Sequence, residues 1–166
     1  MIDQKKLEKF IYYNGLANPF IHLTTKIDIT NIYKYCSEHK NLYATIGYVI
    51  ISAINKVDAF KYRYEDNEIK YYDKINISFT DKIEDDHVGY FDIEYNNNYD
   101  EFIKYYKKEQ KRFKEAKESI STERYDVIWV SCLPWFKFTS LISPFDSKNN
   151  MTQFIWDKVE EENNRY

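Results

Sequence analysis

The fold is decided by the stretch Ser131-Cys132-Leu133-Pro134-Trp135-Phe136-Lys137-Phe138-Thr139-Ser140. The residues that lead into it, from Asp126 to Leu133, form an apolar run that is typical of a strand at the centre of a sheet. We expect the Pro134-Trp135 pair to lie within this strand. A Pro-Trp pair that is followed at once by Phe-Lys-Phe-Thr-Ser is rare by chance, so the stretch is both a predicted core strand and a candidate signature.

The residues around this stretch show two different hydrophobic periods. Between Tyr43 and Val57 apolar residues recur at three- and four-residue steps, which predicts a central core helix. A shorter helix is expected to follow Thr30 as its cap, and a long charged helix is expected over 99–117. The period is two in the segments 62–64 and 69–71, which predicts a hairpin of half-buried strands. Further strands are expected at 75–80, 87–95 and 153–156, the last of these because it is apolar.

The order of these elements predicts the fold class. Strands are grouped apart from helices, so we expect an α+β protein rather than a wound βαβ fold. A two-layer α/β sandwich, with a mixed sheet and helices on one face, fits this order. The 166 residues contain only 3 Gly and 3 Pro and show no linker, which predicts a single domain over residues 1–166.

Composition excludes several partners and sites. A net charge of -3 with interleaved lysines and acids argues against nucleic acid as a partner. No stretch approaches the ~20 apolar residues of a membrane span. We therefore predict no membrane anchor. The two cysteines, Cys36 and Cys132, do not have the spacing of metal ligands or of a disulfide framework. We therefore predict that the protein binds no metal and is cytoplasmic. In its apolar strand, Cys132 is expected to be an inert core thiol.

The motifs together resemble the chloramphenicol acetyltransferase family. Besides the Pro-Trp-Phe-Lys-Phe-Thr-Ser segment, four further segments are similar to that family and occur in its order: 23–30, which is expected to be a strand leading into the first helix, 43–60, 93–95 with Phe102, and 154–158. The resemblance covers nearly the whole chain. It implies the two-layer fold of CoA-dependent acyltransferases.

The resemblance also implies an activity. Enzymes of this family move an acetyl group from acetyl-CoA to a hydroxyl of a small molecule, and they are trimers whose active sites lie between subunits. Ser140 matches the serine that donates a hydrogen bond to the oxyanion of the tetrahedral intermediate. We therefore expect an acetyl-CoA-dependent O-acetyltransferase of the antibiotic-inactivating type, which acts as a homotrimer.

Further site residues follow from the same resemblance. Tyr12 and Tyr13 match an aromatic pair that lines the acceptor pocket, although packing of an N-terminal helix is the alternative. Val88 stands where the family has a pocket phenylalanine, and Ile155 where it has a threonine that orients water. These two departures imply a changed acceptor pocket. Tyr43 and Lys158 match positions near the coenzyme, where they are expected to contact adenine and phosphate respectively.

The family's general base is a histidine in a His-x-x-x-Asp-Gly motif, and no such motif occurs in the 166 residues. His22, His39 and His87 are the only histidines, and surface or packing roles are expected for them. The resemblance therefore predicts a domain that is incomplete at its C-terminus and inactive alone. The alternatives are a non-catalytic product, a partner in mixed trimers, or a module that binds or sequesters a ligand.

Overall fold

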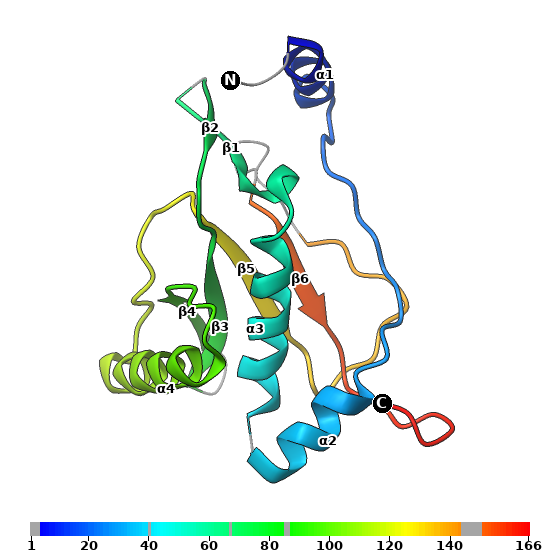
Figure 1. The fold of residues 1–166 in the computed structure, drawn as a ribbon, viewed down its shortest axis with the longest axis vertical. Coiled ribbons are helices and arrows are strands. Elements are labelled where there is room, and N and C mark those ends of the chain that lie inside the picture. Colours follow the sequence, from blue (N-terminus) through cyan, green and yellow to red (C-terminus); the bar gives the residue numbers. More distant parts are fainter. Residues whose placement is uncertain (1–3, 40, 67, 85–86, 144–150) are drawn as a thin grey trace.

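The computed structural model describes residues 4–39, 41–66, 68–84, 87–143 and 151–166 (Figure 1). Its helical elements are α1 (Gln4–Asn14), α2 (Thr30–His39), α3 (Leu42–Ile54), the 3-10 turn η1 (Asp58–Lys61) and α4 (Tyr99–Ala116). Its strands are β1 (Tyr62–Glu65), β2 (Glu68–Tyr71), β3 (Asn76–Glu84), β4 (His87–Ile93), β5 (Val127–Cys132) and β6 (Gln153–Trp156). The predicted helices and strands are found at these positions, apart from the segment 23–30 and the Pro134-Trp135 pair, which are described below.

The strands form one mixed sheet and a separate hairpin. The main sheet has the order β4-β3-β5-β6, while β1 and β2 pair with each other. β3 is antiparallel to β4, whereas β3–β5 and β5–β6 are parallel pairs. The chain reaches β5 from β3 through β4 and α4, which is the long connection that a parallel pair requires. The expected α+β class with a mixed sheet is confirmed.

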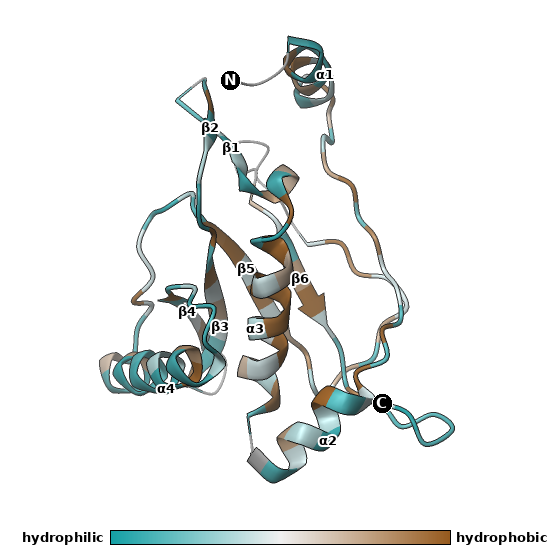
Figure 2. Cartoon of the chain, in the orientation of Figure 1, coloured by the Kyte–Doolittle hydropathy of each residue, from teal (hydrophilic) through white to brown (hydrophobic). Residues whose placement is uncertain are grey.

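The two faces of the sheet differ because side chains alternate along each strand. One face carries buried apolar side chains from β3, β4 and β5 and partly buried ones from β6, and it packs against α3 and α4, which lie on the same side (Figure 1). Figure 2 shows the hydrophobic colouring concentrated on α3 and on the strands behind it. Val88 and Ile155 fall on the opposite face. Val88 is out of phase with the core residues Phe91 and Ile93 along β4, and Ile155 lies between Phe154 and Trp156, which pack against the core.

Phe79 of β3 is the centre of the core. Its fully buried ring makes edge contacts with Tyr43 of α3 and Tyr106 of α4, at centroid distances of 5.2 and 4.9 Å. It also stacks on Phe91 of β4 at 5.7 Å. Gly47 on α3 makes room for this ring: a Cβ there would lie 2.4 Å from Phe79 Cζ. The close approach of α3 to the sheet therefore depends on a glycine within the helix.

An asparagine caps the N-terminus of each of the two long helices, α3 and α4. Asn41 accepts a hydrogen bond from the Ala44 N–H at the start of α3, and Asn98 accepts one from the Glu101 N–H at the start of α4. Asp100 and Glu101 in the first turn of α4 favour the positive end of its dipole. α4 ends at Ala116, and the residue that caps it, Lys117, adopts a left-handed conformation with φ of 55°.

A polar network closes the end of the sheet near the hairpin. The buried Arg63 guanidinium donates to the main-chain oxygens of Phe60, Tyr62, Tyr125 and Val127, at 2.6 to 3.1 Å. These bonds tie β1 to the start of β5. Beside them Asp126 accepts two hydrogen bonds from Arg124, at 2.5 and 2.6 Å. Although burial would raise the pKa of Asp126, its bonds to Arg124 hold that pKa below the usual 3.8.

The predicted strand over 23–30 is wrong. Residues 18–29 run as an extended arm outside the sheet, with no strand among them (Figure 1). The segment has the alternating pattern of a strand, but its main chain forms no strand pairing with the described residues. The predicted cap is also corrected: Asp28 accepts the Thr30 N–H at 2.9 Å, while Thr30 Oγ1 instead accepts the Tyr166 N–H at 2.8 Å.

The Pro134-Trp135 pair does not lie within a strand, contrary to the prediction. β5 ends at Cys132, and Pro134 and Trp135 occupy a tight turn closed by the Phe136 N–H and the Leu133 oxygen at 3.0 Å. Proline has no N–H to donate to a ladder, and its fixed φ suits the second position of such a turn. The apolar sequence therefore continues beyond Cys132, where β5 ends.

Replacing Gly47 by Ala should destabilise the fold. The added methyl group must displace the Phe79 ring, and overpacking of a core site costs about 1–3 kcal/mol, more than alanine's gain in helix propensity. The free energy of unfolding in urea measures the loss. Gly15→Ala is the matched control, because its Cβ would meet only ordinary contacts at 3.5 and 3.6 Å. Equal stabilities of the two variants would contradict this packing.

Acid should weaken the network around Asp126. Because the folded pKa lies below the unfolded one, its stabilisation is complete above about pH 4 and is lost as the pH falls through the lowered folded value. Asp126→Asn should be less stable than wild type at neutral pH by about 1 kcal/mol, and the gap should narrow in acid. Urea unfolding across the pH range tests this, with the exposed Asp73→Asn as control. A gap that stays constant in acid would show that Asp126 is not the titrating group.

Candidate active site

The candidate site lies where β5 and β6 end. These strands are parallel, with Trp129 opposite Gln153 and Cys132 opposite Trp156, so their carboxyl ends meet at one edge of the sheet. The chain beyond β5 carries the Pro-Trp segment and Ser140, and the chain beyond β6 carries Lys158. Two regions that the sequence separates are thus brought together by the strand pairing.

Main-chain and carboxylate contacts hold the two regions against each other. The Leu133 N–H donates to the Trp156 oxygen at 2.9 Å, and the Lys158 N–H donates to the Phe136 oxygen at 3.1 Å. Further along, the Phe138 N–H donates to Asp157 Oδ2 at 3.2 Å. Ser140 follows two residues later, so the path of its segment is fixed by β6 and the residues after it.

Asp157 is a positioning residue that the sequence analysis did not assign. Asp157 lies between the predicted site residues Ile155 and Lys158, and its carboxylate accepts a hydrogen bond from the main chain of residues 133–140, here called the serine segment. The stretch 154–158 was singled out by its resemblance, but nothing in the sequence pairs Asp157 with Phe138, 19 residues away. A second link, the ion pair of Lys137 with Glu160, joins the same two segments at the surface.

The three predicted residues in this region differ in exposure. Ser140 and Lys158 are exposed, and Ile155 is half-buried. The Ser140 hydroxyl is thus available to a bound molecule, and the Lys158 ammonium lies on the chain segment that is bonded to Phe136. A hydroxyl donor and a cation on neighbouring segments are suited to a reactant that carries a carbonyl group and a phosphate.

Tyr43 lies beneath this region in the core. Its hydroxyl donates to the Thr80 oxygen at 2.8 Å and reaches the Val130 oxygen at 3.2 Å. Its ring contacts Trp156 at a centroid distance of 5.2 Å, and burial raises the pKa of its phenol far above the ordinary value. These contacts give Tyr43 a packing role under β5 and β6, and its contact with a coenzyme stays a prediction.

The other predicted pocket residues lie apart from Ser140 within one chain. Val88 is on β4, the far edge strand, and is 57% exposed. Tyr12 and Tyr13 are on α1, which lies at the opposite end of the molecule from the carboxyl end of β6 (Figure 1). Both tyrosines are exposed, and they contact each other edge to face at 5.3 Å. A pocket that contains all of these residues would need more than one copy of the chain.

The histidines lie on parts of the chain other than the segment that carries Ser140. His22 lies in the extended arm and His87 is exposed on β4, while the side chain of His39 is outside the described part of the chain. Cys132 ends β5 as a free thiol, and burial, with the charge of Asp157 second, raises its pKa to about 11. A thiol with so high a pKa is a poor nucleophile at neutral pH.

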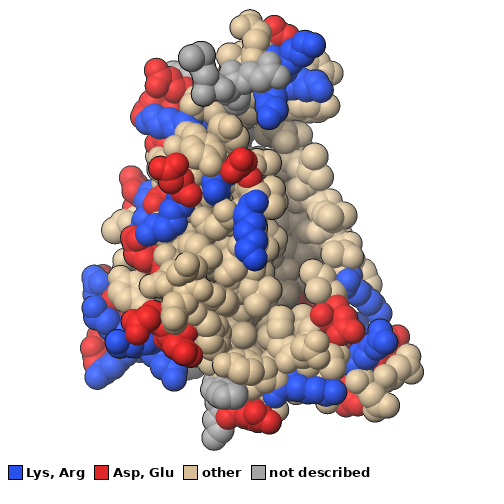
Figure 3. All heavy atoms as spheres, viewed as in Figure 1, with Lys and Arg blue, Asp and Glu red and all other residues tan. Residues whose placement is uncertain are grey.

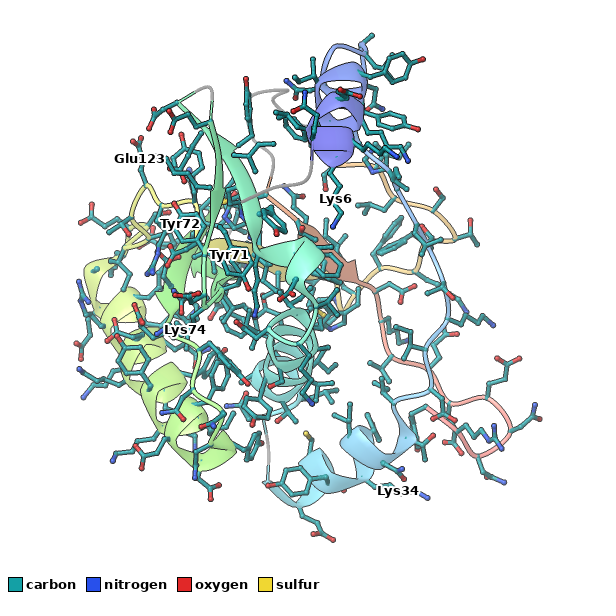
Figure 4. All side chains as sticks on the ribbon, turned by 45° about the horizontal axis from the view of Figure 1, so that its top comes forward. Lys6, Lys34, Tyr71, Tyr72, Lys74 and Glu123 are labelled. Carbon is teal, nitrogen blue, oxygen red and sulfur yellow. The ribbon has the colours of Figure 1, made fainter. Side chains whose placement is uncertain are left out.

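Cavities and metal ligands do not single out another site. A cavity of about 510 Å³ at the start of α2 is lined by Asp28–Ile32 and Arg165, and one of about 480 Å³ is lined by polar residues that include Asn55 and Lys74. Figure 4 shows Lys74 well separated from Lys34 on α2. Neither cavity includes a predicted site residue. The described residues contain no His, Cys, Asp and Glu group suited to a metal ion, and no helix among them is long and apolar enough to span a membrane.

Comparisons with known proteins agree with the fold. The family model described as "CAT: Chloramphenicol acetyltransferase" matches residues 2–162. A solved structure named chloramphenicol acetyltransferase superposes with a TM-score of 0.82 at 18% sequence identity, over 98% of this chain and 82% of that chain. Among curated proteins none matches the chain. The family match spans the sheet, both long helices and the Pro-Trp segment.

The raised pKa of Cys132 predicts slow alkylation. In the folded protein its rate with iodoacetamide should climb about tenfold per pH unit from about pH 7 to about pH 10 without a plateau, because the thiolate stays a minor species below pH 11. Quantification of the labelled peptide by mass spectrometry measures this. The same peptide in urea is the control and should level off near the ordinary thiol pKa of about 8.5. Levelling at that pH in the folded protein would rule out the desolvated thiol.

Proposed function

Because the chain belongs to the chloramphenicol acetyltransferase family, we propose that it takes part in the transfer of an acetyl group from acetyl-CoA to the hydroxyl of a small molecule. The observation that carries the proposal is the serine segment. Ser140 is exposed on a segment that is bonded to the chain after β6 through Phe136 and Phe138. Acyl transfer needs such a fixed donor near the reacting carbonyl.

Ser140 is assigned to the oxyanion. When the acceptor hydroxyl attacks the thioester carbonyl, the carbonyl oxygen gains negative charge, and the Ser140 O–H donates a hydrogen bond to it. A donor that is positioned beforehand stabilises this charge by about 3 kcal/mol. Asp157 supports the role from a distance, because its bond to the Phe138 N–H restrains the main chain that leads to Ser140.

The proton of the acceptor hydroxyl requires a base within hydrogen-bond reach. His22, His39 and His87 lack the Asp-Gly context of the family motif, so we assign none of them to this role. In the proposal the base is supplied from outside residues 1–166. These residues alone are accordingly expected to bind the reactants and to turn them over poorly.

The acceptor pocket is proposed to form between copies of a trimer. Val88 and Ile155 share the face of the sheet opposite the helices, but they lie on the two edge strands, β4 and β6. Neighbouring strands are about 4.8 Å apart, so three strand spacings separate them by roughly 14 Å. Tyr12 and Tyr13 are exposed at the far end of the chain. A second copy is therefore needed to bring these pocket residues to one acceptor.

The reactants follow from the same assignments. Lys158 is proposed to meet a phosphate of acetyl-CoA, with Tyr43 at the adenine, although its packing against Trp156 limits that contact. The acceptor is proposed to be a small hydroxylated antibiotic of chloramphenicol's class, in a pocket that Val88 and Ile155 reshape. The free thiols of Cys36 and Cys132 support a reducing, cytoplasmic setting, which is part of the proposal.

Imidazole should rescue the reaction if the base is the missing component. With acetyl-CoA and chloramphenicol, residues 1–166 should release CoA slowly, and added imidazole should raise the rate above the protein-free background. Ser140→Ala should lower the rescued rate about 10²-fold, because the oxyanion loses its donor. Ser143→Ala, a few residues along the same segment, is the matched control and should keep the rescued rate.

Binding measured by calorimetry completes this test. Rescued turnover that survives in Ser140→Ala would remove the serine from the mechanism. Tight binding of acetyl-CoA or chloramphenicol without any rescued turnover would favour a ligand-binding module instead. Sedimentation of the same samples measures the oligomeric state, because the proposed acceptor pocket needs more than one copy of the chain.

A further inference from the structure

The C-terminal end of α1 carries a reactive pair of residues. Asn14 is the last residue of α1, Gly15 follows it, and both are exposed. Of the three glycines in the chain, this is the only one that follows an asparagine. The side-chain amide of an asparagine can be attacked by the main-chain nitrogen of the next residue, and glycine obstructs that attack least because it has no side chain.

The backbone does not require glycine at position 15. The φ of Gly15 does not lie in the left-handed region that favours glycine. A Cβ there would lie 3.5 Å from the Tyr12 oxygen and 3.6 Å from the Ile11 oxygen, which are ordinary contacts. An alanine at this position is therefore expected to keep the fold while it hinders attack on Asn14.

The last turn of α1 controls access to the Gly15 nitrogen. The Gly15 N–H is shared between the Ile11 and Tyr12 oxygens, at 3.2 and 3.3 Å. Both bonds are longer than the common N–H···O distance of about 2.9–3.0 Å, and the ends of helices fray. While these bonds are closed, the nitrogen keeps its proton and its place in the helix. When they open, the nitrogen can reach the Asn14 amide.

This opening involves one turn of α1 and leaves the rest of the helix in place. No residue of α1 is buried, so opening its last turn exposes little apolar surface. One turn earlier, Phe10 packs against the Tyr64 ring at a centroid distance of 4.9 Å. Beyond the turn, the Phe20 N–H donates to Asn18 Oδ1 at 3.1 Å. The contacts on both sides of Asn14 can therefore persist while the turn opens.

A carboxylate at position 14 would lie in an unfavourable field. The charged residues of α1, at positions 5, 6, 8 and 9, are all in its first half, and Figure 3 shows them, mostly blue, at the end of the molecule where α1 lies. The last turn carries no basic residue. A new negative charge there would meet the negative end of the helix dipole without a compensating cation. Conversion of Asn14 to an acid should therefore loosen the turn that holds Tyr12 and Tyr13.

We propose that Asn14 is a site of spontaneous deamidation and that the last turn of α1 sets its rate. The Gly15 nitrogen gives up its proton to water and forms a bond to Cγ of Asn14. The bond between Cγ and Nδ2 breaks, and Nδ2 leaves as ammonia. Water then opens the five-membered imide at either carbonyl, which gives aspartate, or isoaspartate with the main chain running through Cγ. Water is the only co-reactant, so the inference goes beyond the proposed function and does not depend on it.

Incubation of the folded chain in mildly alkaline buffer tests the site. Peptide mapping by mass spectrometry should show Asn14 converted to the acid, partly as isoaspartate, at a rate that increases with pH because the attacking nitrogen must lose its proton. Asn18 is the control within the same tryptic peptide. It is also exposed, but the nitrogen of Pro19 has no proton to lose and cannot form the imide. Equal conversion of Asn14 and Asn18 would overturn the proposal.

Gly15→Ala and unfolding in urea separate the reaction from the fold. Gly15→Ala should convert Asn14 at least about tenfold more slowly than wild type, because the methyl group obstructs the attack. It should stay slower in urea, where helix stability no longer contributes. The wild-type chain should react several-fold faster in urea than when folded, because the turn is open. Equal rates in the two states would show that the turn does not control the reaction, and conversion in urea alone would show that the native protein has no such site.

Discussion

The contact of the Phe79 ring with Gly47 is the constraint on which the layered structure depends. A helix interior disfavours glycine, yet here the absence of a side chain lets α3 lie directly on the sheet. The same ring contacts Tyr106 of α4 and Phe91 of β4, so one side chain of β3 sets the positions of both long helices. Tyr43, one turn before Gly47, then reaches Trp156 and carries this packing to β6.

The geometry of the candidate site depends on that packing. β6 is a short edge strand, and its place is set by β5 on one side and by Tyr43 beneath Trp156. The residues that follow it hold the serine segment through Asp157 and the Lys158 main chain. Thus the group that we propose to be catalytic lies on an irregular segment that helices and strands hold in place, as is usual for functional residues on loops.

The spacing of apolar residues along the chain was enough to predict the helices and strands that bury one regular face. The core helix at α3, the charged helix at α4 and the β1–β2 hairpin were evident from their periods. The Pro-Trp turn was not, because an apolar run does not show where ladder pairing stops. Residues 23–30, most of which lie in the arm, were predicted as a strand, because a strand pattern does not show whether a partner strand is present.

Non-local contacts explain what was missed at the site. Asp157 and Phe138 are brought together by the pairing of β5 with β6, a relation that only the fold supplies. The resemblance assigned Val88, Tyr12 and Tyr13 to the same pocket as Ser140, yet one chain places them on different edges and ends. A resemblance between sequences can assign a role to a residue, but it does not show which copy of the chain contributes that residue to a given pocket.

The bonds of Arg63 have a consequence for partly unfolded states. Its four partners are main-chain oxygens, which do not titrate, whereas Arg124 beside it depends on the carboxylate of Asp126. Protonation of carboxylates therefore loosens the edge of the network and leaves its centre bonded. An acid-expanded form of the protein would keep the β1–β2 hairpin attached to β5, and its amides there would be the last to exchange with solvent deuterium.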